Sequence, residues 1–257
     1  MLVQGAVGVV TGGASGLGEG VIRMLAASGG KGIIFDLPSS KGADLVAELG
    51  EDTVRFVPVD ITDPAQVTAA AEAAGEAFGR VDLLVSCAGI SSAKRMLRRD
   101  GEVHPLEHFR AHVDVNLVGL FDVVRNIVPV MARNEPSDEG ERGLIVNLAS
   151  IAGIEGQVGQ MSYAASKGGV IGLTLPLARD LASWGIRVMT ICPGTMHTPM
   201  LATLSDEMIE GLAEQNVFPK RLGAPADLAG LVAHFMENTF LNGDVVRLDA
   251  ALRMSPR

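Results

Sequence analysis

The fold follows from one stretch near the start of the chain, Ala6-Val-Gly-Val-Val-Thr-Gly-Gly-Ala-Ser-Gly-Leu-Gly18. Its first half is a short apolar run typical of a buried strand, and residues 17–28 then have the apolar spacing of a helix. Glycines at Gly12, Gly16 and Gly18 would let the chain turn tightly and let backbone N–H groups approach a pyrophosphate at the helix start. Turns use glycine for many reasons, but a glycine turn between a strand and a helix predicts dinucleotide binding.

The alternation of strand and helix continues along the chain. Further strands are expected at residues 32–35, 54–59, 83–87, 144–148, 187–191 and 244–248. Helices are expected at residues 41–49, 64–78, 109–132, 163–181 and 225–236, with a short one between Pro199 and Pro219. Thr62 or Asp63 would cap the helix that Pro64 opens. This pattern favours right-handed crossovers and a parallel sheet covered on both faces. We therefore predict one doubly wound (Rossmann) α/β domain over residues 1–257, with a mostly parallel seven-stranded sheet and helices on both faces.

The composition excludes several classes of protein. With 257 residues, 47% of them apolar and 20% charged, the chain can bury a full core. A formal charge of −9 argues against general binding of nucleic acid or anionic membranes, because no global positive field attracts phosphates. Cys87 and Cys192 form no Cys-x-x-Cys pair, so we expect no disulfide framework or thiolate zinc site. No apolar run has membrane-spanning length and the first residues do not resemble a targeting peptide, so we expect a cytoplasmic protein.

Asp36 follows the second expected strand and bears on the cofactor. A carboxylate there can accept both adenosine-ribose hydroxyls and would repel a 2′-phosphate, which favours NAD over NADP. The alternative is a turn-forming Asp before Leu37 and a proline. Asp60-Ile61 and Cys87-Ala88-Gly89 end the next two strands and should border the adenine and ribose. Asp60 could equally only initiate the helix that follows it.

Residues 150–167 carry the candidate chemistry. Tyr163 is the single tyrosine of the chain, and Lys167 stands four residues later, so on a helix the two share one face. Ser150 follows an expected strand. A hydroxyl, a phenol and an ammonium placed together could transfer a proton beside a carbonyl carbon.

The order of these features resembles the short-chain dehydrogenase/reductase family. The resemblance rests on the glycine turn, Asp36, Asp60, Ala88-Gly89, Asn116, Ser150, Tyr163-x-x-x-Lys167 and Pro193-Gly194. It implies that Tyr163 is the general acid/base and that Lys167 and the oxidised nicotinamide both lower the Tyr163 pKa. It also implies that Lys167 binds the nicotinamide ribose and that Ser150 bonds the substrate oxygen. It further implies that Asn116 holds a proton-relay water and that the protein is a homotetramer in which the helix of Tyr163 and its neighbour meet across a two-fold axis.

The resemblance also implies the residues of the two binding sites. Cofactor contacts are expected at Gly12, Ser15, Gly16, Leu17, Gly18, Asp36, Leu37, Asp60, Ile61, Cys87, Ala88, Gly89, Tyr163, Lys167, Pro193, Gly194, Met196 and Thr198. Substrate contacts are expected at Ser150, Gln160 and Tyr163.

A finer resemblance is to one subgroup of that family, the type-2 3-hydroxyacyl-CoA dehydrogenases. It rests on Cys87-Ala-Gly, Asn134-Glu-Pro, Glu155-Gly-Gln-Val-Gly-Gln160, Thr174-Leu-Pro-Leu-Ala-Arg-Asp180 and Phe240-Leu-Asn-Gly-Asp-Val-Val-Arg-Leu-Asp249. It implies an acyl-CoA substrate. The chain departs from the pattern at Ser86, where the family often has Asn, and at Ala250-Ala251, where the subgroup has Gly first.

Three segments interrupt the alternation. Residues 91–108 and 198–220 leave strands at their carboxyl ends, so they are candidates to enclose a substrate. The first contains Lys94, Arg95, Arg98 and Arg99, which either attract the phosphates of a CoA thioester or form a solvated loop. Residues 134–142 enter a strand and are expected at the opposite edge as a solvated loop. The substrate pocket should be apolar, formed by Ile151, Met161, Met196, Met200 and Leu201.

Other functions remain open at this point. The substrate could be a hydroxysteroid or another secondary alcohol, whereas a ketoacyl carrier-protein reductase is disfavoured because Asp36 opposes NADPH. From another class, the protein could be an NAD-binding scaffold without catalysis, although its Ser150, Tyr163, Lys167 and Asn116 are intact. A metal site at His104, His108 and His112 would need one continuous helix, and Pro105 interrupts their spacing; a packed or solvated helix face is the expected alternative.

Overall fold

The computed structural model describes residues 1–201 and 205–256, and its parallel strands form one sheet. The strand order is β3-β2-β1-β4-β5-β6-β7. The strands are β1 (Val7–Thr11), β2 (Lys31–Asp36), β3 (Val54–Pro58), β4 (Leu83–Ser86), β5 (Gly143–Leu148), β6 (Ile186–Pro193) and β7 (Val245–Leu248). The order reverses between β1 and β4, which is where doubly wound sheets open a crevice for ligands. The predicted fold class is confirmed.

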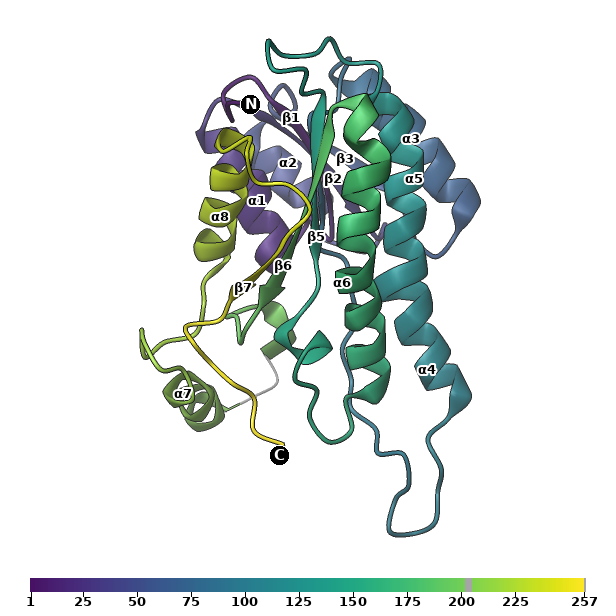
Figure 1. Ribbon diagram of the computed structural model, residues 1–257, viewed down its shortest axis with the longest axis vertical. Helices are drawn as coiled ribbons and strands as arrows, with labels where there is room; N and C mark the ends of the chain where they lie inside the picture. The colour runs from purple at the N-terminus through teal and green to yellow at the C-terminus, as the bar shows by residue number, and fades with distance from the viewer. Residues whose placement is uncertain (202–204, 257) are drawn as a thin grey trace.

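Helices cover both faces of this sheet (Figure 1). One face packs against α1 (Gly16–Ala27), α2 (Gly42–Leu49) and α8 (Pro225–Glu237). The other packs against α3 (Pro64–Ala77), α5 (Leu120–Met131) and α6 (Met161–Leu181). Alternate strand residues serve the two sides: Val9 and Ile33 enter one core, and Val10 and Ile34 enter the other. The sheet is therefore buried on both sides, as parallel sheets usually are.

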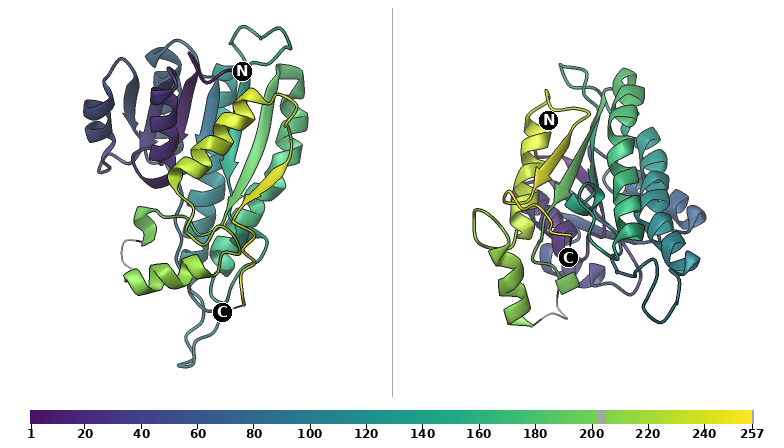
Figure 2. Two further views of the ribbon diagram at one scale, coloured as in Figure 1. Left: turned by 90° about the vertical axis from the view of Figure 1, so that its left-hand side faces the viewer. Right: turned by 60° about the horizontal axis from the view of Figure 1, so that its bottom comes forward.

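The carboxyl ends of the strands gather the irregular segments. Figure 2 shows α7 (Asp206–Glu214) and the C-terminal residues at this end of the sheet, away from the N-terminus. The short helix expected between Pro199 and Pro219 is thus present, preceded by the 3₁₀ turn Pro199–Leu201. The part of that segment at positions 202–204 lies outside the described residues.

The long helix predicted over residues 109–132 differs from the structure in two ways. It begins earlier, as α4 (Leu106–Val113), because Pro105 stands just before the first turn, where its missing N–H is not needed. Between α4 and α5 the chain forms a π-helical turn, Asp114–Gly119. Apolar periodicity does not reveal such a turn, which is often found at functional sites.

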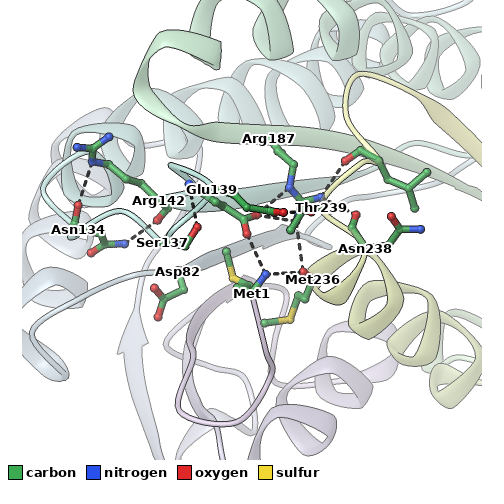
Figure 3. A network of polar contacts seen from close by, with 12 residues as sticks. Met1, Asp82, Asn134, Ser137, Glu139, Arg142, Arg187, Met236, Asn238 and Thr239 are labelled. Atoms are coloured by element: carbon green, nitrogen blue, oxygen red, sulfur yellow. Dashed lines mark hydrogen bonds and ion pairs between the residues drawn. The ribbon is translucent and has the colours of Figure 1, made fainter.

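Residues 134–142 lie at the amino end of β5, as expected, but they are not simply a solvated loop. Glu141 is buried and accepts hydrogen bonds from Arg187 Nε at 2.7 Å and from the Met1 amino group at 2.8 Å. Arg187 also donates to the carbonyl oxygens of Leu241 and Met236 at 2.8 and 3.4 Å (Figure 3). Residues 135–140 are exposed, as predicted for a solvated loop, and Glu141 departs from the prediction because a charged pair can be buried when its donors find acceptors.

This ion pair gives a stability prediction. Glu141→Gln should lower the free energy of unfolding by about 3–5 kcal/mol, because it leaves the Arg187 guanidinium buried without a counter-charge. The expected fall in Tm is about 6–20 °C in a scanning calorimeter. Glu51→Gln is the matched control: Glu51 pairs with Arg55 at an exposed site, where such pairs contribute about 1 kcal/mol or less. An equal fall in Tm for the two variants would contradict this account.

Candidate active site

One cleft of about 600 Å³ opens at the carboxyl ends of the strands. All the residues predicted to contact the cofactor line it, as does Ser150. They come from the turn after β1, from the ends of β2, β3, β4 and β5, from α6, and from the segment after β6. Parallel strands place these ends at one edge, so residues far apart in sequence meet there.

The glycine turn has a backbone that other residues would strain. Gly12 and Gly16 have φ of +64° and +54°, in the left-handed region. A Cβ on Gly18 would collide with the carbonyl oxygen of Gly12, so this glycine lets the first turn of α1 lie close against the strand end. The start of α1 therefore faces the cleft with free N–H groups. That arrangement fits the pyrophosphate of a dinucleotide.

Asp36 is held in place by two backbone amides. Its Oδ2 accepts from Ala14 N at 3.0 Å and its Oδ1 from Leu37 N at 2.8 Å, which fixes the carboxylate beside the glycine turn. Asp60 also lines the cleft, but its Oδ1 accepts from the Thr62 amide and hydroxyl. Asp60 thus initiates the next turn as well as bordering the cleft, and the cap of α3 is Asp63.

Ser150, Tyr163 and Lys167 are brought together. Ser150 follows β5 and caps the 3₁₀ turn Ile151–Gly153, with Oγ accepting from Ala152 N at 3.1 Å. Its side chain also bonds the Tyr163 phenol. Lys167, one turn along α6, is 4% exposed and donates from Nζ to the Leu148 carbonyl at 2.8 Å. A phenol, a hydroxyl and an ammonium thus meet at the wall of a cleft suited to a dinucleotide.

Comparisons with known proteins agree with this site. A family model described as short chain dehydrogenase matches residues 6–209. The chain belongs to the short-chain dehydrogenase family. It is 49% identical over 255 residues to the 3-hydroxyacyl-CoA dehydrogenase type-2 of Rattus norvegicus, covering 99% of this chain and 97% of that protein. The enzyme of the same name from Drosophila melanogaster is 49% identical over 256 residues, covering 99% and 100%.

A solved structure shares the fold as well. The crystal structure of 3-hydroxyacyl-CoA dehydrogenase type-2 from Mycobacterium avium superposes with a TM-score of 0.93 at 44% identity, covering 98% of each chain. Family membership makes this chain an oxidoreductase with a nicotinamide cofactor.

The electrostatics of the dehydrogenase site are dominated by burial. Burial raises the pKa of the Tyr163 phenol, and the hydrogen bond from Ser150 opposes that rise only in part. Burial also lowers the pKa of Lys167 to about 8. The Lys167 Nζ lies 6.0 Å from the centre of the Tyr163 ring. We expected Lys167 and an oxidised nicotinamide together to favour the phenolate, whereas burial of Tyr163 acts in the opposite direction. The positive charge of an oxidised nicotinamide, when bound, would oppose this effect of burial.

Asn116 lies in the π-helical turn, fully buried beside Lys167. A Cβ on Gly89 would lie 3.0 Å from Asn116 Oδ1, a tight contact, and 3.5 Å from Lys167 Nζ, an ordinary one, so glycine here leaves room for the amide of Asn116. Asn116 Nδ2 donates to Ile90 O and Ser166 Oγ, and its Oδ1 accepts from Ile90 N. The side chain thus joins the segment after β4 to α6. Its expected role in holding a water stays a prediction.

Several residues that we expected to contact the substrate do not line the cleft. Gln160 stands one turn before Tyr163, but its side chain bonds Gln157 and does not line the cleft. Ile151 and Met161 are also absent from the lining, whereas Met196 and Leu201 belong to it. The side chain of Met200 lies outside what the structure describes.

The cleft also includes residues that the sequence did not predict. They are Phe35, Val59, Thr62, Ile90, Val115, Leu148, Ala149, Thr195 and Pro199. Most of them end a strand or follow one, so the rule that ligands bind beyond strand carboxyl ends would have found them. Val115 lies in the π-helical turn and had no such signal.

The three histidines contact hydroxyl groups. Within residues 1–201 and 205–256, no cluster of three or more candidate ligands could hold a metal ion. His104 bonds Ser162 at 2.7 Å and His108 bonds Ser92 at 2.8 Å. His112 is buried, which agrees better with the expected packed helix face than with a metal site.

The geometry of the site predicts the effect of one substitution. Tyr163→Phe removes the phenol oxygen and keeps the ring, so turnover should fall by about 10²–10⁴-fold, the usual contribution of a general acid/base. Reduced cofactor should still bind with an affinity within about threefold of the wild type, measured by its fluorescence, because the cleft is otherwise unchanged. Turnover at the wild-type rate would refute the assigned role of Tyr163.

Proposed function

We propose that this dehydrogenase uses NAD to interconvert 3-hydroxyacyl-CoA and 3-ketoacyl-CoA. The observation that carries the proposal is the joint placement of Ser150, Tyr163 and Lys167 in a cleft that also holds Asp36. The acyl-CoA substrate is supported by relatives named 3-hydroxyacyl-CoA dehydrogenase type-2, which match almost the whole chain.

The residues of the chain divide the work of the reaction. Tyr163 takes the proton of the substrate hydroxyl during oxidation and returns it to the carbonyl oxygen during reduction. Ser150 donates a hydrogen bond to that oxygen, where negative charge develops. Lys167 stabilises the phenolate and would hold the nicotinamide ribose. The nicotinamide, when bound, supplies the hydride chemistry.

The choice of NAD over NADP rests on Asp36. The wild type should prefer NAD by about 100-fold or more in kcat/KM, since like charges held together cost several kcal/mol. Asp36→Asn should reduce this preference by about tenfold or more, because it removes the repulsion of the 2′-phosphate. Asp60→Asn is the matched control, because Asp60 lines the same cleft but bonds Thr62. A wild type that prefers NADP would defeat this reading of Asp36.

The basic residues after β4 are consistent with a CoA thioester. Lys94, Arg95 and Arg99 are exposed in the segment that follows β4, whereas Arg98 forms ion pairs with two neighbouring carboxylates. Three unshielded positive side chains could meet the phosphates of CoA. A solvated loop remains the alternative, and hydroxysteroids or simple secondary alcohols remain the competing substrates.

A substrate panel tests the proposal. With NAD⁺, 3-hydroxybutyryl-CoA and medium-chain 3-hydroxyacyl-CoAs should give kcat/KM at least about 100-fold above hydroxysteroids and simple secondary alcohols. Oxidation of hydroxysteroids without oxidation of 3-hydroxybutyryl-CoA would overturn the substrate. Binding of NADH without turnover of any alcohol would favour the scaffold alternative.

We further propose a homotetramer and a cytoplasmic location. Val118, Phe121 and Leu175 are exposed apolar side chains on the outer surface of the π-helical turn, α5 and α6, which supports a contact between copies there. Light scattering after gel filtration gives the mass directly, and a monomer would contradict the proposed assembly.

In the described part of the chain, no helix has the length and apolar character needed to cross a membrane.

A further inference from the structure

Three imidazoles and two hydroxyls form a continuous hydrogen-bonded row beside the first turn of α6. We call it the histidine–serine chain; its members are, in order, His104, Ser162, His108, Ser92 and His112. The contacts are 2.7 Å from His104 Nε2 to Ser162 Oγ, 3.4 Å from Ser162 Oγ to His108 Nδ1, and 2.8 Å from His108 Nε2 to Ser92 Oγ. The Ser92 amide reaches His112 Nε2 at 3.2 Å. The proposed reaction uses none of these groups.

The backbone partners determine where the protons lie. His104 Nδ1 faces the Lys94 carbonyl at 3.2 Å and His112 Nδ1 faces the His108 carbonyl at 2.8 Å, so both nitrogens must donate. In neutral rings the Nε2 atoms then accept, from the Ser162 hydroxyl and from the Ser92 amide. The oxygen of Ser162 is left to accept from His108 Nδ1, and His108 Nε2 accepts from the Ser92 hydroxyl. Every donor finds an acceptor when all three imidazoles are neutral.

The row joins three segments beside the proposed substrate site: residues 91–104, α4 and α6. Ser92 lies in residues 91–104, which follow β4, and Ser162 is the residue before Tyr163 in α6. The same segment bonds the loop of residues 155–160 through Lys94 N and Gly159 O at 2.9 Å. Ile90, at the base of the segment, lines the cleft. Opening of the row would therefore loosen the segment that continues from this lining residue, next to the helix turn that carries Tyr163.

We propose that the histidine–serine chain is a pH-sensitive latch that positions residues 91–104 against the first turn of α6, so that acidification weakens substrate binding and leaves cofactor binding unchanged. The latch itself needs only the contacts above. Its link to substrate rests on the proposed function.

The charges around the row explain the direction of the effect. His108 faces His112 from its own helix α4 and both His104 and Lys94 from the segment before it, while α6 contributes Ser162, which does not titrate in this range. Burial and these three basic groups lower the pKa of His108.

The sign of the pH dependence follows. Because the folded-state pKa of His108 lies below its value of about 6.5 in an open chain, the open state binds more protons. The closed latch is thus fully stable above about pH 6.5 and loses stability as the pH falls through the folded-state pKa of His108.

Hydrogen exchange tests the latch without substrate. In wild-type protein, peptides within residues 91–104 should lose protection by about tenfold between pH 7.5 and about pH 5.5 after correction for the intrinsic exchange rate, while peptides of β5 and α8 should not. The double variant His108→Gln/His112→Gln, whose amides do not titrate, should show a change below about threefold. His234→Gln, on α8, is the matched control and should respond like the wild type. Protection of residues 91–104 that is unchanged by acid in the wild type would overturn the latch.

Steady-state kinetics test its link to substrate. In wild type and in His234→Gln, the KM for 3-hydroxybutyryl-CoA should rise about tenfold over the same pH interval, and the KM for NAD⁺ less than about twofold. The double variant should lose most of the rise. If acid loosens the segment but does not raise the KM for 3-hydroxybutyryl-CoA more than the KM for NAD⁺, the proposed effect on substrate binding is overturned. Absence of any acyl-CoA turnover would overturn the proposed function, and hydrogen exchange would still decide the latch.

Discussion

The buried ammonium of Lys167 is the interaction on which the site depends. A charge that is 4% exposed needs close partners, and its Nζ donates to the Leu148 carbonyl at the end of β5. That bond fixes α6 against the sheet. Tyr163, one turn earlier, is thereby held next to Ser150, which leaves the same strand. Gly89 leaves space for the neighbouring Asn116, because a Cβ there would lie only 3.0 Å from Asn116 Oδ1.

Because all strands of the sheet run in the same direction, the candidate catalytic groups and the buried ion pair lie at opposite ends of the strands. The carboxyl ends of all strands lie at one edge of the sheet, where the glycine turn, Asp36 and the catalytic residues line the same cleft. The buried pair of Arg187 and Glu141 ties β6 to the loop before β5 at the opposite edge (Figure 3). Strain and burial of polar groups at the first edge are tolerated because the second edge and the two cores hold the sheet. Loops at the carboxyl edge can vary without unfolding the domain.

The sequence predicted what depends on local pattern. The strands were located to within about two residues because apolar runs and turn signals alternate regularly, and Tyr163 and Lys167 met because four residues make one helical turn. Burial of Glu141 was not predictable, since its partner Arg187 is 46 residues away and the loop itself reads as polar. The substrate contact of Gln160 was implied by the resemblance, but its side chain bonds within its own loop. Long-range polar pairing and the orientation of loop side chains have no periodic signal.

One measurement tests the central claim, that a positive cofactor lowers the pKa that burial raises at the Tyr163 phenol. The chain contains a single tyrosine, so the near-ultraviolet absorbance of tyrosinate reports Tyr163 alone. Titration of the free protein should give a midpoint above about 10, because burial raises the pKa. Saturating NAD⁺ should lower the midpoint by about two units or more. The same midpoint with and without NAD⁺ would contradict the account.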